Sequence, residues 1–203
     1  MARGRPRKLD TDIVLDTALR LFWKNGYDAT SMNDISAVTG MAKPGLYASF
    51  GNKDALYSMA LDRYVNGFND ELAALARSEK PVQQAVREFL EAVAHAATDE
   101  AGPCGCFLAN TLVQTSGKPS GITDMSRRLN ERRNQAFAER FKRASQRGEL
   151  AEGANPGDLA AFFSAQALAL ALMASSGLLC SDLMPVIDTA MGVLPPQRGT
   201  ATV

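Results

Sequence analysis

The sequence predicts an all-α protein, with an N-terminal three-helix unit of the helix-turn-helix type followed by a larger helical domain, about nine helices in all. Two observations support this class. Apolar residues recur at three- and four-residue spacing along most of the chain, and no segment alternates apolar and polar residues as a half-buried strand would. With 203 residues, 46% of them hydrophobic and 22% charged, the chain can bury a sizeable core and has the composition of a soluble globular protein.

The N-terminus is basic in a chain whose net charge is zero, since the first eight residues hold Arg3, Arg5, Arg7 and Lys8 and no acid. This cluster predicts a flexible basic arm over residues 1–8, in which Arg5 and Arg7 contact a polyanion, although a solubilising tail would have the same composition. No apolar run follows the arm, so no signal peptide is expected. Three cysteines are too few for a disulfide framework, which favours a cytoplasmic setting.

The predicted helix-turn-helix domain spans residues 9–51. Its first helix begins after the capping residue Asp10 and stops at Asn25-Gly26. Ser31 and Asp34 have the spacing of a capping box, which predicts a second helix over about residues 32–38. The expected inner face of that helix is Met32, Ile35 and Val38.

A tight turn at Thr39-Gly40 then leads to a third helix over about residues 43–49. Pro44 lies in its first turn, where a missing N–H costs little. Leu46 and Phe50 are spaced to point back into the core.

Residues 52–194 are predicted to form the second domain, and residues 195–203 a disordered tail. Asn52 caps a long helix to about residue 77, with an inner face of Leu56, Met59, Ala60, Tyr64, Phe68, Leu72 and Leu75. Further helices are expected over about residues 82–98, 104–115, 123–146, 159–178 and 183–193. In the helix over 123–146, Leu129, Phe137 and Phe141 should face inward, and Arg127, Arg128, Arg132 and Arg133 should mostly face water.

Residues 30–53 have the layout of a DNA-reading unit: a short helix, a turn with a small residue, and a second helix able to enter a major groove. Candidate phosphate contacts are Ser31, Lys43, Tyr47 and Lys53, and the groove-facing side of the third helix carries Pro44, Gly45 and Ser49. A plain helical hairpin has the same spacing, so spacing alone leaves both interpretations open.

The residues themselves add a resemblance. The stretch ALRLFWKNGYDATSMNDIS, the turn VTG and the block AKPGLYASFGNKDAL resemble the N-terminal domain of the TetR family of bacterial transcriptional regulators over about 55 residues. The resemblance implies a homodimeric, all-helical repressor whose N-terminal helices bind a palindromic operator in double-stranded DNA. It further implies a C-terminal pocket for a small-molecule effector and a dimer interface formed by the last two helices. By position, the DNA contacts that it implies are Ser31, Tyr47 and Lys53.

The sequence departs from that family's pattern at the third helix. Ala42 stands where the family has a serine or threonine cap, and Pro44 and Gly45 stand where glycine and threonine are typical. The helix is therefore poor in side chains that read bases, apart from Lys43. We expect backbone contacts to dominate its affinity, and deletion of residues 1–8 to weaken operator binding.

The second domain should hold the effector pocket. Aromatic residues and polar residues on otherwise apolar helices are the candidates, because a buried polar group needs a partner that a ligand can supply. These residues are Phe68, Phe89, His95, Phe107, Asn110, Thr111, Gln114, Phe137, Phe163 and Gln166. The competing explanation for each is an ordinary core residue or one bonded to backbone.

Cys104-Gly-Cys106 opens an expected helix, whose N-terminus would lower the pKa of a thiol. With His95 or Cys180 it offers an alternative function, a redox- or metal-sensing regulator. A single C-x-C lacks the second ligand pair of a zinc motif, so packing is the competing explanation and no metal or cofactor is assigned.

Small and apolar residues repeat at helical spacing in the last two helices and leave more apolar surface than a monomer of this size can hide, which predicts a symmetric dimer. The expected interface is Phe163, Ala167, Leu170, Ala174, Leu183, Ile187 and Met191. The apolar stretch over residues 159–179 lacks the basic flanks of a membrane span. With one histidine and no nucleophile, phosphate-loop or HExxH motif, the chain is not expected to be an enzyme. A helical binding protein without DNA contact is the remaining alternative.

Overall fold

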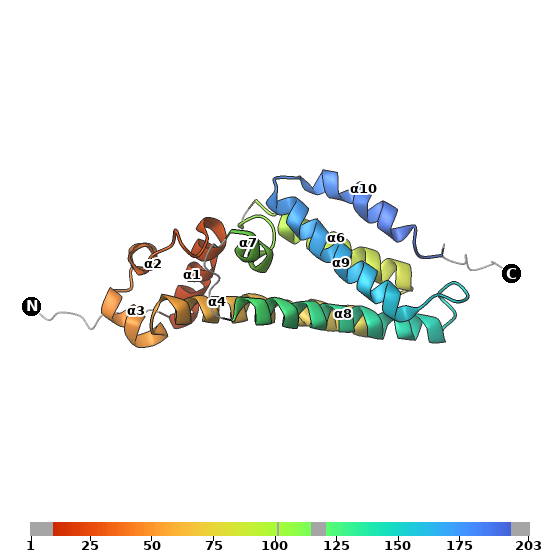
Figure 1. Ribbon diagram of the computed structural model, residues 1–203, viewed down its shortest axis with the longest axis horizontal. Coiled ribbons are helices and arrows are strands. Elements are labelled where there is room, and N and C mark those ends of the chain that lie inside the picture. The colour runs from red at the N-terminus through yellow and green to blue at the C-terminus, as the bar shows by residue number, and fades with distance from the viewer. Residues whose placement is uncertain (1–9, 101, 115–120, 196–203) are drawn as a thin grey trace, which may run out of the picture.

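The computed structural model describes residues 10–100, 102–114 and 121–195, all of whose regular elements are helices. The fold class is therefore as predicted. Three helices, α1 (Thr11–Asn25), α2 (Met32–Thr39) and α3 (Lys43–Phe50), form a unit at one end of an elongated molecule (Figure 1). The remaining helices form the body, and α4 (Lys53–Gly67) runs from the first unit into it.

Local capping sets the ends of the first helices as the sequence indicated. The Asp10 carboxylate accepts from the Asp12 N–H, and Ser31 and Asp34 form the reciprocal capping box of α2. Ala42 offers α3 no side-chain cap. One expectation was wrong: Val38 is 61% exposed rather than part of the inner face, because α2 is short and only Met32 and Ile35 turn toward α1.

The expected single helix from residue 53 to about 77 is two helices, α4 and α5 (Asn69–Arg77), which meet at Phe68. Gly67 lies just before the break, where a residue without a side chain weakens a helix. Met59, expected on the inner face, is 40% exposed. The other expected inner residues of α4 and α5 are buried, except that Phe68 is half-buried.

The body is completed by α6 (Val82–Ala97), α7 (Phe107–Gln114), α8 (Ile122–Gln146), α9 (Pro156–Ser175) and α10 (Cys180–Met191). The long helix α8 lies along α5 and α9, and α10 covers α6 and α9 (Figure 1). By length and composition α9 would be apolar enough to cross a membrane, but here it packs against α6, α8 and α10.

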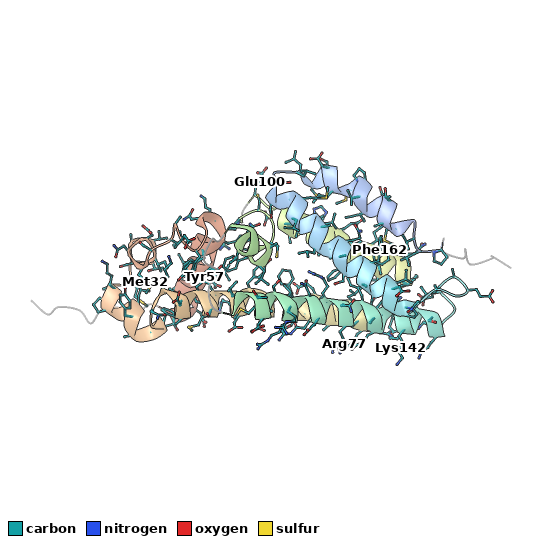
Figure 2. The ribbon with its side chains drawn as sticks, viewed as in Figure 1. Met32, Tyr57, Arg77, Glu100, Lys142 and Phe162 are labelled. Carbon is teal, nitrogen blue, oxygen red and sulfur yellow. The ribbon has the colours of Figure 1, made fainter. Side chains whose placement is uncertain are left out.

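An aromatic cluster joins the three-helix unit to the body. Tyr57 of α4, labelled in Figure 2, packs edge-on against Phe22, Tyr27 and Phe107, and its hydroxyl is 2.6 Å from the hydroxyl of Thr111 in α7. The Trp23 indole of α1 donates to the Cys104 carbonyl at 3.3 Å and lies edge-on to Tyr64, with ring centroids 5.0 Å apart. Packed rings therefore connect α7 to α1 and α4.

Candidate DNA interface and ligand cavity

The turn between α2 and α3 is held by short polar contacts. Gly40 ends α2 in the left-handed region, with φ of 71°. The Thr39 hydroxyl donates to the Ile35 carbonyl at 2.6 Å, and the Ser36 hydroxyl donates to the Met41 carbonyl at 2.8 Å. These bonds fix the direction in which α3 leaves the turn.

One side of α3 anchors it and the other is open to solvent. Leu46 and Phe50 are buried at 0% and 5% exposure. The opposite side is exposed and carries Lys43, Pro44, Tyr47, Ala48 and Ser49, while Gly45 is half-buried beside Met41. Tyr47 is 51% exposed, so its hydroxyl is accessible to a phosphate. The geometry matches a recognition helix that approaches the groove closely.

Ser31, a predicted phosphate contact, is exposed at the N-terminus of α2. Its hydroxyl is 2.6 Å from the Asp34 carboxylate, and its backbone N–H donates to the same carboxylate at 2.8 Å. These hydrogen bonds from Ser31 lower the pKa of Asp34. The Ser31 hydroxyl must therefore turn away from Asp34 before it can donate to a phosphate.

Lys53, which is also a predicted phosphate contact, is the first residue of α4. Its ammonium nitrogen lies 4.2 Å above the centre of the Tyr27 ring, and the Tyr27 hydroxyl donates to the Asp54 carboxylate. Burial, followed by the Asp54 hydrogen bond, raises the pKa of Tyr27 to about 12. The ring thus positions Lys53 at one end of the exposed surface of α3. Arg5 and Arg7 lie outside the described residues.

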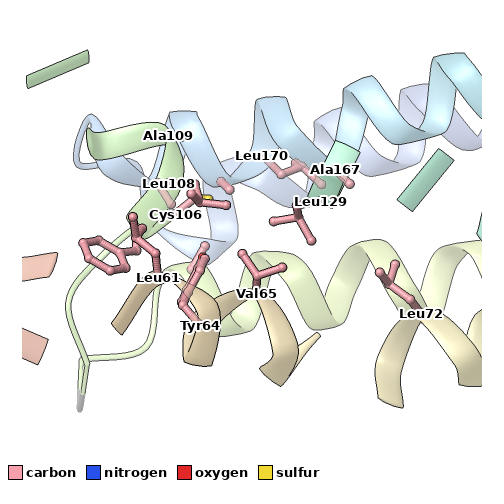
Figure 3. Packing of buried hydrophobic residues seen from close by; sticks show 14 of the residues in the cluster. Leu61, Tyr64, Val65, Leu72, Cys106, Leu108, Ala109, Leu129, Ala167 and Leu170 are labelled. Carbon is pink, nitrogen blue, oxygen red and sulfur yellow. The ribbon is translucent and has the colours of Figure 1, made fainter. Parts of the chain in front are cut away.

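The body contains two adjoining cavities of ≈ 180 Å³ and ≈ 70 Å³, which share the lining residues Cys106, Leu129, Arg133 and Leu168. Figure 3 shows Cys106 from the segment before α7, Leu129 from α8 and Ala167 from α9 gathered beside Tyr64 of α4. Leu108 and Leu172 line the larger cavity, and Trp23, Phe68, Phe89 and Val93 line the smaller one. Trp23 belongs to α1, so the three-helix unit itself supplies part of the smaller cavity's wall.

Of the predicted pocket residues, Phe68 and Phe89 line the smaller cavity. Four others are buried or bonded elsewhere: Phe137 and Phe163 pack in the core, Phe107 lies in the aromatic cluster, and the Thr111 hydroxyl meets Tyr57. Asn110 donates to the Cys104 carbonyl, and His95 is exposed. Gln166 is half-buried and lines neither cavity. The side chain of Gln114 lies outside the described part.

Arg133 is a cavity-lining residue that was not predicted from the sequence. It was expected to face water, but it lines both cavities, and burial lowers the pKa of its guanidinium. A signal was present, because Arg133 lies four residues after Leu129 and four before Phe137, on the stripe of α8 that faces inward.

The three cysteines are free thiols in different environments: Cys104 is exposed, Cys106 is buried and Cys180 is half-buried. The Cys180 sulfur lies 3.3 Å from Nδ1 of His95. Within the described ranges, no three side chains of His, Cys, Asp or Glu lie together so as to hold a metal ion.

The residues expected at the dimer interface are buried within the chain's own core. Phe163, Ala167, Leu170, Ala174, Leu183, Ile187 and Met191 are all at most 7% exposed. They pack α9 and α10 against α6 and α8, so they are not available to a partner. The outer side of α9 instead presents Ala161, Ala165, Leu168 and Leu172, of which Leu168 is half-buried and the others exposed.

Comparisons with known proteins bear on both halves of the chain. Residues 14–59 match the family model described as bacterial regulatory proteins, tetR family. Residues 82–180 match the model of a tetracyclin repressor-like C-terminal domain. The first match includes α2, the turn and α3, and the second includes the segments that line most of the cavities.

Two curated relatives span nearly the whole chain. The HTH-type transcriptional repressor ComR of Escherichia coli (strain K12) is 34% identical over 198 residues, covering 96% of this chain and 93% of ComR. The uncharacterized HTH-type transcriptional regulator YezE of Bacillus subtilis (strain 168) is 27% identical over 194 residues, covering 94% and 99%.

A solved structure has the same fold. A cysteine mutant of the TetR family transcriptional regulator CifR, in complex with 26-base-pair operator DNA, has a TM-score of 0.83 and 25% identity to this chain. The alignment covers 94% of this chain and 100% of the CifR chain.

Proposed function

The chain belongs to the tetR family of bacterial regulatory proteins, a family of DNA-binding transcriptional regulators rather than enzymes, and from this premise we propose a specific mode of action. The protein acts as a homodimeric repressor in the cytoplasm. It binds a palindromic operator through α3, and a small-molecule effector in the body releases it.

The observation that carries the proposal is the exposed face of α3 on a turn fixed by hydrogen bonds. Tyr47 and Lys43 are exposed on this face, and Lys53 lies over Tyr27 at its end. Phosphate contacts of this kind position a reading helix, while the small groups of Pro44 and Gly45 permit close approach to the base edges. The name of ComR as a repressor, and the operator complex of CifR, support DNA binding and repression.

Release by an effector is supported by the shared wall between the cavity and the DNA-binding unit. Trp23 lines the smaller cavity and also donates to the Cys104 carbonyl. A ligand that binds better to one position of Trp23 than to another shifts α1, and with it α3. The effector need only favour the conformation in which the two recognition helices of a dimer no longer match two half-sites.

A dimer is supported by the outer stripe of α9, where Ala161, Ala165, Leu168 and Leu172 follow one another at four-, three- and four-residue spacing. Small side chains on such a stripe allow a second helix to pack closely. A twofold dimer brings two copies of α3 to one face and so requires a palindromic operator.

A redox-sensing regulator is the second candidate, favoured by the thiols near the cavity. Cys106 lines both cavities, and the Cys180 sulfur lies within 3.3 Å of His95. Replacing Cys104 and Cys106 by serine tests it: loss of an oxidant response in operator binding supports this function, and an unchanged response removes it.

The main proposal is tested with a gel shift that uses the DNA flanking the protein's own gene. We expect binding that weakens steeply as salt increases, because phosphate contacts release counterions, and that exceeds binding to scrambled DNA of the same length. Absence of salt-dependent binding to any flanking fragment would contradict the proposal. In transcription from the same fragment, added protein should lower the yield of transcript.

A further inference from the structure

Among the described residues that line the two cavities, Arg133 is the one with a charged side chain. Arg133 lines both cavities, whose other walls include Leu129, Leu168, Phe68 and Phe89. Burial in these surroundings lowers the pKa of the guanidinium, yet an arginine keeps its proton at neutral pH. A partly buried charge costs free energy unless an opposite charge compensates it.

No carboxylate of the chain supplies that compensation. Every Asp and Glu lies in the part of the chain that the structure describes, and none forms an ion pair with Arg133 there. The fully buried Arg140 is treated differently: at 0% exposure, it pairs with Glu149 at 3.1 Å. Arg133 therefore has no carboxylate counterion among the described residues, whereas Arg140, on the same side of α8, has one.

The guanidinium also has free hydrogen-bond donors. Its Nε donates to the Ser164 hydroxyl at 3.1 Å, and its Nη2 donates to the Asn130 side-chain oxygen. A guanidinium has five N–H groups, so the others, including both on Nη1, have no acceptor among the described residues. Ser164 and Asn130 hold the group in place while leaving a pair of donors of the kind that a carboxylate accepts in parallel.

From this arrangement we propose that the effector site takes a small carboxylate with an apolar body, bound by Arg133 and enclosed by the leucine and aromatic walls. The inference rests on the proposed function, because it assigns a ligand class to that same cavity. The carboxylate accepts from the free donors of Arg133, and the apolar part fills the space beside Leu129 and Phe89. Cavities of ≈ 180 Å³ and ≈ 70 Å³ suit an acid of a few carbon atoms rather than a long chain.

The test is calorimetric titration of the full-length protein with hexanoate and benzoate, each compared with its uncharged amide, hexanamide or benzamide. We expect the acids to bind about tenfold more tightly than the amides, because only the acids offer a charged acceptor. This comparison on the unmodified chain needs no substitution, so it does not depend on whether a variant folds.

Variants then assign the preference to one residue. Arg133→Gln should abolish the preference for acid over amide, and Arg133→Lys should keep part of it because the charge remains. The matched control is Arg132→Gln, an exposed neighbour on α8 that contacts Asn69 and should leave binding unchanged. Thermal melts of each variant establish that it is folded at the temperature of the titration.

The outcomes are distinct from those of the proposed function. If the protein binds its operator but neither acid binds, or the amides bind as tightly, the inference is overturned while the regulator remains. The same holds if Arg133→Gln retains the acid preference. If acids bind through Arg133 but no flanking DNA is bound, the proposed function fails and the ligand site stands.

Discussion

At the scale of single residues, Tyr47 is the side chain of α3 best placed to position the protein on DNA. Its hydroxyl has no hydrogen-bond partner among the described residues, and the residue is 51% exposed. We predict that Tyr47→Phe weakens operator binding about tenfold, because one hydrogen bond to a charged phosphate is lost. Fluorescence anisotropy with labelled operator measures the change.

A contact to phosphate does not depend on the DNA sequence, so binding to scrambled DNA serves as the control. Tyr47→Phe should weaken binding to operator and to scrambled DNA by similar factors. Equal affinity of the variant and the unmodified protein for operator would show that the hydroxyl does not contact phosphate. The exposed position means that the melting temperature should not change.

Residue-level predictions succeeded where the chemistry is local. The caps at Asp10, Ser31 and Asn52 form as the sequence indicated, because a cap involves residues two or three apart. Arg133 was missed because a charged residue on a long helix was interpreted as surface. Its spacing from Leu129 and Phe137 places Arg133 on the inward-facing side of α8. The sequence alone does not indicate that a cavity lies on that side.

At the scale of elements, Gly105 determines how closely the segment before α7 approaches the end of α9. Its φ is +82°, and a Cβ built there would lie 2.7 Å from Cβ of Ser175. We predict that Gly105→Ala lowers the free energy of unfolding by about 3 kcal/mol, from backbone strain together with overpacking. Urea denaturation at fixed protein concentration measures it, since dimer stability depends on concentration.

Gly177 provides a matched control for the crowding. Its φ is +96°, but nothing lies within 4 Å of an added Cβ. Gly177→Ala should therefore cost only the backbone strain, about 1 kcal/mol. Equal losses in the two variants would mean that contact with Ser175 does not matter and that the segment before α7 can move away from α9.

The helices themselves were largely predictable, but α7, α9 and α10 begin at Phe107, Pro156 and Cys180 rather than at about residues 104, 159 and 183. The break at Phe68 divides a pattern that is apolar at helical spacing on both sides, so periodicity alone continues through it. Val38 and Met59 satisfy that spacing too, yet both are exposed. Spacing identifies a possible inner face, while the neighbouring helices decide how much of it is covered.

At the scale of the whole molecule, the outer stripe of α9 should hold two copies together. We predict that Ala165→Arg, in the middle of this stripe, produces monomers, because a long charged side chain prevents close helix packing. Light scattering after size-exclusion chromatography measures the mass. Operator binding should weaken about 100-fold, since each half-site is then bound alone.

The control is Ala74→Arg, which places the same side chain at an exposed alanine of α5. It should leave both the mass and the affinity unchanged. An Ala165→Arg protein that remains dimeric would locate the interface elsewhere, and an unmodified protein that is monomeric at all concentrations would remove the dimer itself.

Whole-molecule features were the least predictable from the sequence. The apolar character of the last two helices was recognised, but the seven residues assigned to a partner are used within the chain. A helix with apolar residues on several sides does not indicate which side meets its own core and which meets a second copy. That distinction depends on the positions of α6 and α8, which are set by contacts distant in the chain.

The position of Trp23 also gives the protein a built-in optical reporter. It is the only tryptophan in the sequence, it lines the smaller cavity, and it bonds to the segment before α7. The emission excited at the red edge of protein absorbance therefore originates from this one indole, at the junction of the two functional halves. Stopped-flow changes in that emission can give the order in which ligand entry and loss of DNA occur, with no label attached.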